Sequence, residues 1–287
     1  MKKFAKHAAA IFIYAGFLIY GAQANAAHEI IDPPNELEMI KIKGVLRVGV
    51  SITSPKMGYI DPITEEHLGL EVDIARRLAN ELGVVVDFVN VTLSGRYTFL
   101  DRGKVDMSIY DIPYSEEIAR NYDLSPPYFT DYTSLLVKNS SNVRDLSDLI
   151  GKRIGVMKGS NSAEEFVRMM IIRGDISGRS YNPHKFDERY WHEGVEFVVC
   201  KNFAEFNSIL ADDDVVALCH DKTQLIAAQN FEPGRSILDE DFAHKNLSIA
   251  TRKGSSLTPF IKECINNWMA DGTIKEMIYQ NGLTDYD

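Results

Sequence analysis

The sequence predicts an α/β protein with enough apolar residues for two lobes. Short β-rich runs alternate with segments whose apolar residues recur every three or four positions, the pattern of strands connected by helices. The chain has 287 residues, of which 45% are hydrophobic, so it can bury one or two substantial cores. Neither an internal repeat nor a low-complexity segment interrupts this pattern. A two-lobed globular protein fits these observations.

The first 26 residues are predicted to be a cleavable signal peptide. Three lysines precede an apolar run over residues 8–22, and small residues at 24–26 supply a cleavage site before Ala27. An uncleaved anchor is the alternative, but the run is short for a membrane span. We therefore expect export to a periplasm, with an exposed leader over residues 27–39.

The first globular elements are predicted to be a strand and a helix. Residues 45–50 form a β-rich run bounded by glycines, as expected of a buried strand. Residues 70–82 carry an apolar residue every four positions and are followed by Gly83, which predicts an amphipathic helix with a glycine C-cap. Glu71 and Asp73 lie in its first turn, where acidic side chains complement the helix dipole, so we expect a structural role for both.

Residues 103–129 form the stretch around which the chain is organised. A buried strand containing Val105, Met107 and Ile109 leads into a polar loop rich in aromatic residues. Two consecutive prolines then turn the chain into the next strand. Open α/β sheets bind ligands at the carboxyl ends of their strands, which predicts a binding loop here.

Three motifs in this stretch resemble the central signature of the bacterial solute-binding proteins of family 3: GKVD at 103–106, SEE at 115–117 and LSPPY at 124–128. Members of that family are periplasmic receptors of ABC importers for polar amino acids. The resemblance implies a type II periplasmic-binding-protein fold, in which two hinge strands join two α/β lobes. It places the first part of lobe 1 at residues 40–136, lobe 2 at 137–246, and the second crossing with the return to lobe 1 at 247–287.

The resemblance also indicates where a ligand would bind. Asp221 ends a predicted strand at the position where the family has an aspartate that accepts hydrogen bonds from the ligand's α-ammonium; an N-cap is the alternative. Arg96 matches an arginine that members for acidic amino acids place in the cleft; a solvated arginine at a helix start is the alternative. The loop of Ser160, Asn161 and Ser162 opens a helix, so it either offers N–H groups to a carboxylate or caps that helix.

Acidic and aromatic residues complete the predicted site. Asp111 adds a second anion for an ammonium group. Tyr59, Tyr110 and Tyr114 are candidate walls for packing or cation–π contacts. A cationic compound without an α-carboxylate therefore competes with a polar amino acid as the expected ligand.

Several positions depart from the family pattern, and these departures leave the ligand open. Ile118 stands where the family has an arginine that clamps the ligand's α-carboxylate, and Arg120, two residues on, lies on another face of a helix. In the first ligand loop, Thr53, Lys56 and Met57 replace an aspartate, a proline and an aromatic residue.

Charge and spacing argue against several classes of partner. The net charge of −10, without a basic run, argues against nucleic acid and anionic membranes. Neither metal-ligand spacing nor a phosphate-binding loop is present in the sequence, so we expect no metal and no cofactor.

Cys200 and Cys219 each end a predicted strand and form either a disulfide or two buried thiols. Residues 174–194 are longer than the family segment and form a lid, a transporter-docking surface or an inert loop.

We therefore expect a monomeric periplasmic receptor of an ABC importer, which binds a polar amino acid or a related amine-bearing solute in the interlobe cleft. Hinge closure around the ligand would present the closed form to an inner-membrane permease. An enzyme is not expected, although some periplasmic prephenate or arogenate dehydratases resemble these receptors. An accessory receptor for a sensor or dehydrogenase system is a further alternative.

Overall fold

The computed structural model describes residues 35–283, so the predicted signal peptide and most of the predicted leader lie outside the described residues. The leader prediction is wrong at its end, because residues 36–39 belong to helix α1 (Glu36–Lys43). Asn35 and Glu38 form a capping box that starts this helix, and Gly44 ends it in the left-handed conformation. Within residues 35–283, none of the helices is both long enough and apolar enough to cross a membrane.

Lobe 1 is built on a sheet in which β1 lies between β5 and β6 and pairs with both in parallel. Its strands are β1 (Val45–Val50), β5 (Val85–Asn90), β6 (Met107–Pro113) and β7 (Tyr122–Leu124), with β2 (Thr53–Ser54), β3 (Gly58–Ile60) and β4 (His67–Leu68) in a small separate sheet. Its helices, besides α1, are α2 (Leu70–Leu82), α3 (Arg96–Asp101), α4 (Glu116–Asn121), α8 (Leu257–Ala270) and α9 (Thr273–Gln280). The predicted helix over 70–82 and its Gly83 cap are confirmed.

Lobe 2 contains a second parallel group, in which β9 lies between β10 and β11. Its strands are β9 (Arg153–Met157), β10 (Glu196–Cys200), β11 (Val215–Asp221) and β12 (Arg235–Ile237). Its helices are η1 (Leu146–Leu149), α5 (Ser162–Arg173), η2 (Glu188–Tyr190), α6 (Phe203–Ile209) and α7 (Lys222–Phe231). The boundaries of the lobes in sequence stay a prediction.

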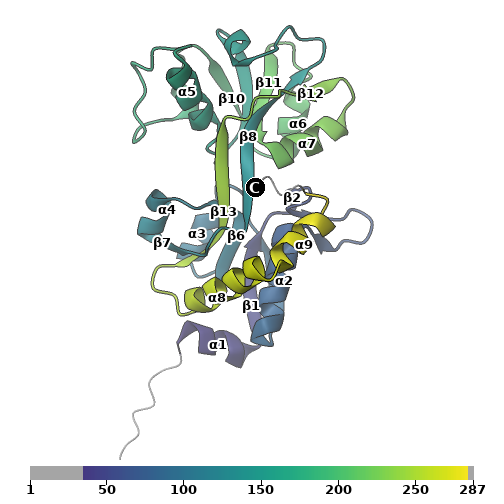
Figure 1. The fold of residues 1–287 in the computed structure, drawn as a ribbon, viewed down its shortest axis with the longest axis vertical. Helices are drawn as coiled ribbons and strands as arrows, with labels where there is room; N and C mark the ends of the chain where they lie inside the picture. Colours follow the sequence, from purple (N-terminus) through teal and green to yellow (C-terminus); the bar gives the residue numbers. More distant parts are fainter. Residues whose placement is uncertain (1–34, 284–287) are drawn as a thin grey trace, which may run out of the picture. The chain divides into compact units, whose positions relative to one another are not determined.

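Two long strands, β8 (Phe129–Lys138) and β13 (Ala243–Arg252), connect the lobes and run antiparallel to each other (Figure 1). β8 pairs with β11 of lobe 2, whereas the second half of β13 pairs with β6 of lobe 1. The hydrogen-bonded ladder is therefore continuous through both lobes, in the order β10-β9-β11-β8-β13-β6-β1-β5.

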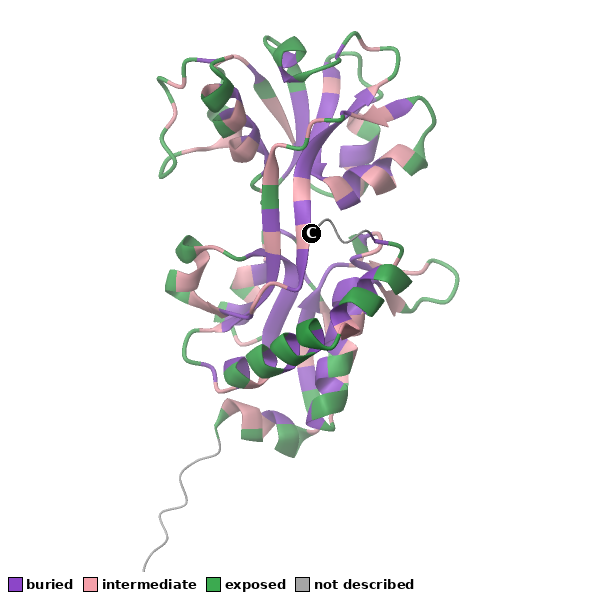
Figure 2. Cartoon of the chain, in the orientation of Figure 1, coloured by how far each residue is buried: buried purple, intermediate pink, exposed green. Residues whose placement is uncertain are grey.

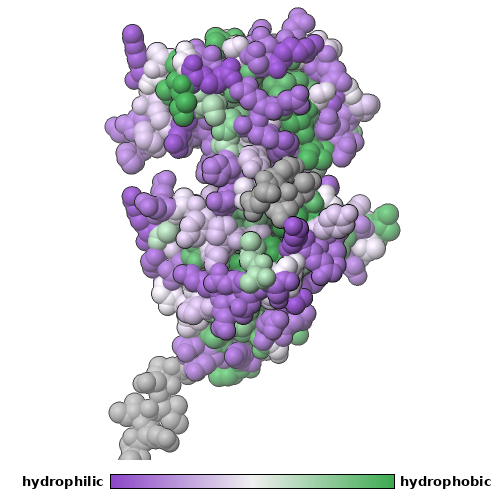
Figure 3. All heavy atoms as spheres, viewed as in Figure 1, coloured by the Kyte–Doolittle hydropathy of each residue, from purple (hydrophilic) through white to green (hydrophobic). Residues whose placement is uncertain are grey.

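Separate apolar clusters hold the two lobes, and the purple segments in Figure 2 show that the sheet is buried in each. The lobe 1 cluster joins Leu46 and Leu78 to Trp268 and Ile278, so it uses residues from both ends of the described chain. The lobe 2 cluster centres on Phe166. The face seen in Figure 3 is mostly hydrophilic over both lobes, as expected of side chains left in water.

Candidate ligand-binding site

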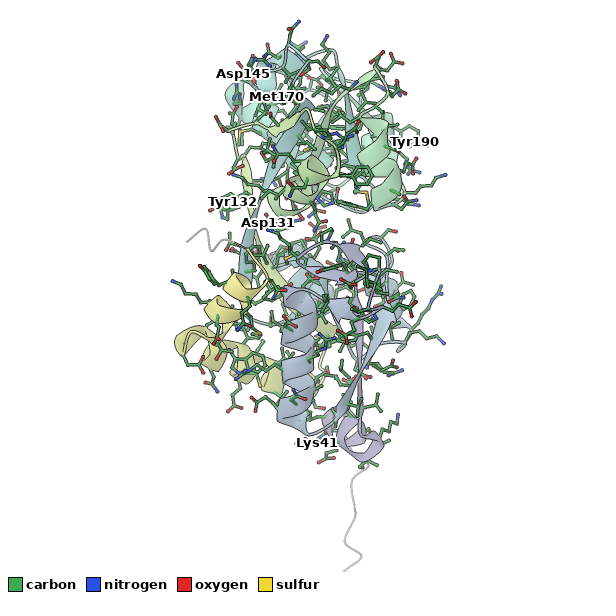
Figure 4. The ribbon with its side chains drawn as sticks, turned by 90° about the vertical axis from the view of Figure 1, so that its right-hand side faces the viewer. Lys41, Asp131, Tyr132, Asp145, Met170 and Tyr190 are labelled. Carbon is green, nitrogen blue, oxygen red and sulfur yellow. The ribbon has the colours of Figure 1, made fainter. Side chains whose placement is uncertain are left out.

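The polar pocket of interest lies where strands of both lobes end. Strands β6 and β11 bring Asp111 and Asp221 to it, and β8 contributes Asp131, which Figure 4 labels on this crossing strand. β6 and β11 belong to different lobes and run in opposite directions, because β11, β8, β13 and β6 are paired antiparallel in turn, so their carboxyl ends meet between the lobes. The lining residues are Thr53, Ser54, Met57, Glu71, Tyr110, Asp111, Asp131, Met157, Phe203, His220, Asp221, Thr223, Gln224 and Leu247.

A backbone irregularity shapes the lobe 1 side of this pocket. The pairing of β6 with β13 shifts between Ser248 and Ala250, which is a β-bulge. Asp111 lies in the bulged part of β6 with a φ of 47°, a left-handed conformation that few residues other than glycine adopt. Its backbone N–H donates a 3.0 Å hydrogen bond to Glu71 Oε1, which holds the bulge in place.

Lys245, on β13, forms ion pairs with the two aspartates. Its Nζ lies 2.9 Å from Asp111 Oδ1 and 2.6 Å from Asp221 Oδ1, and it donates a 2.7 Å hydrogen bond to Asp221 Oδ2. The lysine side chain is 4% exposed and those of the aspartates are 11% and 5% exposed. Neither Asp111 Oδ1 nor Asp221 Oδ1 accepts a hydrogen bond of good geometry, so their contacts with the Lys245 ammonium group are mainly electrostatic.

The charges of this triad stabilise one another. Burial alone would lower the pKa of Lys245, but Asp111 and Asp221 outweigh it and raise that pKa. Burial would raise the pKa of Asp221, yet Lys245 and then His220 hold it below its usual range. The pKa of Asp111 is raised, first by burial and then by the charge of Asp221. Lys245 is therefore charged at neutral pH.

Glu71 is a second buried carboxyl group in the pocket. Its Oε1 accepts hydrogen bonds from the Asp111 N–H and from the Tyr128 hydroxyl at 2.9 Å, whereas its Oε2 has no hydrogen-bond partner among the described residues. Burial raises the pKa of Glu71 to about 8. The group is therefore largely a neutral carboxylic acid near pH 7, with one oxygen available to a ligand.

Asp131 provides a third carboxyl group, next to the triad. The Thr223 hydroxyl donates a hydrogen bond to its Oδ2, and the Tyr132 N–H donates one to its Oδ1 at 2.8 Å. Burial, followed by the charge of Asp221, raises the pKa of Asp131 to about 7. His220 accepts a 2.7 Å hydrogen bond from the Asp221 N–H through Nδ1, so it orients the end of β11.

Arg96 is buried in the structure but does not line this pocket. It is 4% exposed, and its guanidinium donates a hydrogen bond to Leu93 O at 2.7 Å and approaches Gly159 O of lobe 2 at 3.5 Å. The alternative that Arg96 is a solvated side chain at a helix start is therefore excluded. That Arg96 binds a ligand carboxylate stays a prediction. In this structure its guanidinium donates hydrogen bonds to backbone carbonyl oxygens.

The three tyrosines proposed as walls lie in different places. Tyr110 is buried and lines the pocket. Tyr114 is 55% exposed and lines a separate groove that also includes Lys245. Tyr59 is half-buried on β3, where it pairs with Thr53, and it is not in the pocket lining. Of the three, the structure brings only Tyr110 to the aspartates.

The loop of Ser160, Asn161 and Ser162 precedes α5, as the sequence predicts. Asn161 occupies the N-cap position without a side-chain cap, so the predicted N-cap cluster does not form there. The Ser160 hydroxyl donates to Met157 O at 2.9 Å, and the hydroxyl of Ser162 is buried without a partner among the described residues. Asn161 lines the same groove as Tyr114, so this loop borders the groove and not the pocket.

Two other expectations are resolved by the contacts. Cys200, Cys219 and Cys264 are free, buried thiols, so the disulfide alternative is excluded. Ile118, at the position of the family's clamp arginine, packs against the apolar cluster that contains Ile112 and Leu124. No cationic side chain replaces that arginine in the pocket lining within residues 35–283.

The sequence did not indicate Lys245, Glu71 or Asp131 as site residues. For Glu71 a structural role at a helix start was expected, and the structure adds a position in the pocket. Asp131 has a signal in the sequence, since it is an acidic residue three positions after the LSPPY motif at 124–128. Lys245 has none, because only the pairing of β13 with β8 and β6 places its side chain between two aspartates.

Two lobes joined by two crossing strands, with a polar pocket at the strand ends of both, define the class of type II solute-binding proteins. Comparison with known families narrows this class. Residues 46–282 match the profile of the bacterial extracellular solute-binding proteins, family 3, and the chain belongs to that family.

Similar proteins bind amino acids. The chain is 25% identical over 244 residues to the L-cystine-binding protein TcyJ of Escherichia coli K12, with 84% of each chain covered. It is 29% identical over 223 residues to the glutamine-binding protein of Geobacillus stearothermophilus, which covers 76% of this chain and 77% of that protein. Among solved structures, an ancestral arginine-binding protein bound to arginine has a TM-score of 0.69 and 29% identity, and covers 83% of this chain and 97% of that one.

Proposed function

We propose that this protein is the periplasmic receptor of an ABC importer and that it binds a small polar solute, an amino acid or a compound related to one, without chemically converting it. The observation that carries the proposal is the pocket itself. Its lining comes from both lobes and from both crossing strands, so a bound solute would contact all the parts that a hinge motion brings together.

The solute class is supported by the relatives, which bind cystine and glutamine, and by the ancestral protein bound to arginine. The chemistry of the predicted ligand fits a pocket that mixes five apolar or aromatic side chains with hydroxyl, amide, imidazole and carboxyl groups. The α-ammonium of an amino acid would have to compete with the ammonium group of Lys245, which lies between Asp111 and Asp221.

Import and location rest on the sequence. The resemblance of the central signature to receptors of importers supports a membrane permease as partner, and the predicted signal peptide supports a periplasmic protein. Reconstitution provides the test: with a candidate permease in proteoliposomes, solute uptake should require the receptor. Uptake that is equal without the receptor would contradict the importer role.

Ligand binding is tested by thermal unfolding of the chain from Ala27 onward, in the presence of amino acids, amines, dicarboxylates and uncharged amides. A solute at about 100 times its Kd should stabilise the protein by about 2.7 kcal/mol. Phe203→Ala removes a pocket wall and should weaken binding, whereas Phe231→Ala alters a residue that is 68% exposed and should not. A screen without any stabilising solute, or an equal effect of the two substitutions, would contradict the proposal.

The dehydratase alternative has less support from the structure. Prephenate carries two carboxylates, and the pocket lining contains neither lysine nor arginine within residues 35–283. Loss of prephenate can be followed by absorbance. Turnover that disappears in Glu71→Gln, the variant without a buried acid at that position, would favour the enzyme over the receptor.

A further inference from the structure

Lys245 occupies the position that a ligand's ammonium group would take between the two aspartates. Asp111 belongs to lobe 1 and Asp221 to lobe 2, and the Lys245 Nζ lies within 2.9 Å of a carboxylate oxygen of each. From the sequence, these two carboxylates are expected to bind the ammonium group of a solute. In the structure both are already paired with a cation that belongs to the chain.

The lysine is held firmly at this position. Its backbone lies opposite Asp131 in the ladder between β8 and β13, so its main chain is fixed by the crossing strands. Its side chain is 4% exposed. Displacing the ammonium group would leave two buried carboxylates without a counterion, which is strongly unfavourable in a protein interior. A solute that brings its own ammonium group gains little by replacing one that is already tethered there.

We propose that Lys245 is a built-in ammonium group that fills the cation site formed by Asp111 and Asp221, so that the solute taken by the pocket is an uncharged polar compound without an ammonium group. The inference rests on the proposed receptor function and narrows its ligand class. It also explains how a chain that keeps the family's aspartate at the end of β11 can do without the carboxylate clamp at Ile118: the pocket no longer holds a zwitterion.

The rest of the pocket fits such a solute. Glu71 Oε2 is buried without a hydrogen-bond partner, and Gln224 adds an amide that can both donate and accept. Met57, Met157 and Phe203 provide apolar surface. An anionic solute would lack a partner, since the lining contains neither lysine nor arginine within residues 35–283 and Lys245 is neutralised by its aspartates.

The proposal is tested by rescuing a truncated lysine with a small amine, which requires no knowledge of the natural solute. Lys245→Ala removes three methylene groups and the ammonium, a fragment that n-propylammonium replaces. The variant should melt below the wild type, and n-propylammonium should restore its Tm, whereas 1-propanol should not. In the double variant Lys245→Ala/Asp221→Asn, the apparent affinity for n-propylammonium should fall by at least roughly tenfold, because one anionic partner is lost.

Two further variants serve as a control and as an alternative to Lys245→Ala. Lys253→Ala removes a lysine whose side chain is 56% exposed and which pairs with Asp123 at 3.1 Å, and its Tm should not respond to the amine. If Lys245→Ala does not fold, Lys245→Met fills the space of the lysine side chain as far as Cε and leaves only the position of the ammonium group empty, so it keeps most of the packing and should fold. That variant should gain affinity for alaninamide over lactamide, two compounds that differ only in ammonium against hydroxyl.

The wild-type protein should show no Tm shift with n-propylammonium and no preference for alaninamide over lactamide. A shift of the wild-type Tm equal to that of Lys245→Ala would mean that the cation site is open, and would overturn the proposal. So would a failure of the amine to rescue Lys245→Ala, or an unchanged preference in Lys245→Met. These outcomes leave the receptor function untouched, and a solute screen without any hit would leave the rescue result standing.

Discussion

Replacing Glu71 by glutamine should change how the stability of the protein depends on pH. The carboxyl group has an ordinary pKa of 4.5 and a pKa of about 8 in the folded protein, because it is buried. Between these values the folded state binds a proton that the unfolded state has released, so the free energy of unfolding falls as the pH rises. This contribution is fully present below about pH 4.5 and is lost as the pH rises through about 8.

The size of the effect follows from the same values. Each pH unit within that window reduces the free energy of unfolding by up to about 1.4 kcal/mol, for a total on the order of 5 kcal/mol. Glutamine stays neutral at every pH and its amide oxygen can still accept from the Asp111 N–H and the Tyr128 hydroxyl. The variant should lose about half of the pH-dependent decrease and should become the more stable protein at high pH. A decrease of similar size should remain from Asp131, whose pKa is raised from 3.8 to about 7.

Urea denaturation of both proteins at several pH values from about 5 to about 9 measures this difference. The charges that face Glu71 are those of Asp111 and Arg96, and both are kept in the variant. Glu276→Gln, on the exposed side of α9, is the matched control and should follow the wild type. Parallel curves for the wild type and Glu71→Gln would refute the account of a buried neutral carboxyl group at this position.

Three other predictions concern packing and thiols. Gly69→Ala should lower the free energy of unfolding, measured by urea denaturation, by at least about 2 kcal/mol, because Gly69 has a φ of 118° and the added Cβ would lie 2.4 Å from Met57 O. Gly44→Ala should lower it by only about 1 kcal/mol, because Gly44 has a φ of 69° and no atom lies within 4 Å of the added Cβ. Equal losses would contradict this distinction. Phe166→Ala should cost about 3–5 kcal/mol in the same assay, since this ring is fully buried in lobe 2, and a loss below about 1 kcal/mol would argue against that core. A thiol reagent should label the three cysteines only after unfolding, and a reductant should leave the Tm unchanged; labelling of the native protein would contradict their burial.

The fold could be predicted from the sequence because periodicity and motif point to the same answer. The apolar stripe of the 70–82 segment, its Gly83 stop and the strand at 45–50 are all present in the structure. These features are local, so they depend on few distant contacts. The resemblance of the 103–129 stretch then supplied the arrangement of the lobes, and the family match confirms it.

The site could be predicted only in part. Asp111 and Asp221 were expected to act together, and they do lie together, because they lie near the carboxyl ends of β6 and β11, which run in opposite directions and meet between the lobes. Lys245 was missed because the second crossing was predicted to begin at residue 247, whereas β13 begins at Ala243. The first residues of β13 carry no apolar alternation, because His244, Lys245 and Asn246 are all polar, so their strand conformation depends on pairing with β8. A contact set by that register is not visible in local sequence.

The route of the chain through the lobes has a consequence for how the protein is made. Lobe 2 lies within a single stretch between β8 and β13, whereas the lobe 1 cluster needs Leu46 and Leu78 as well as Trp268 and Ile278. During emergence from a ribosome or a translocation channel, lobe 2 can close its core while lobe 1 still lacks α8 and α9. A chain truncated before α8 should therefore have a folded second lobe and a first lobe that is exposed to proteases.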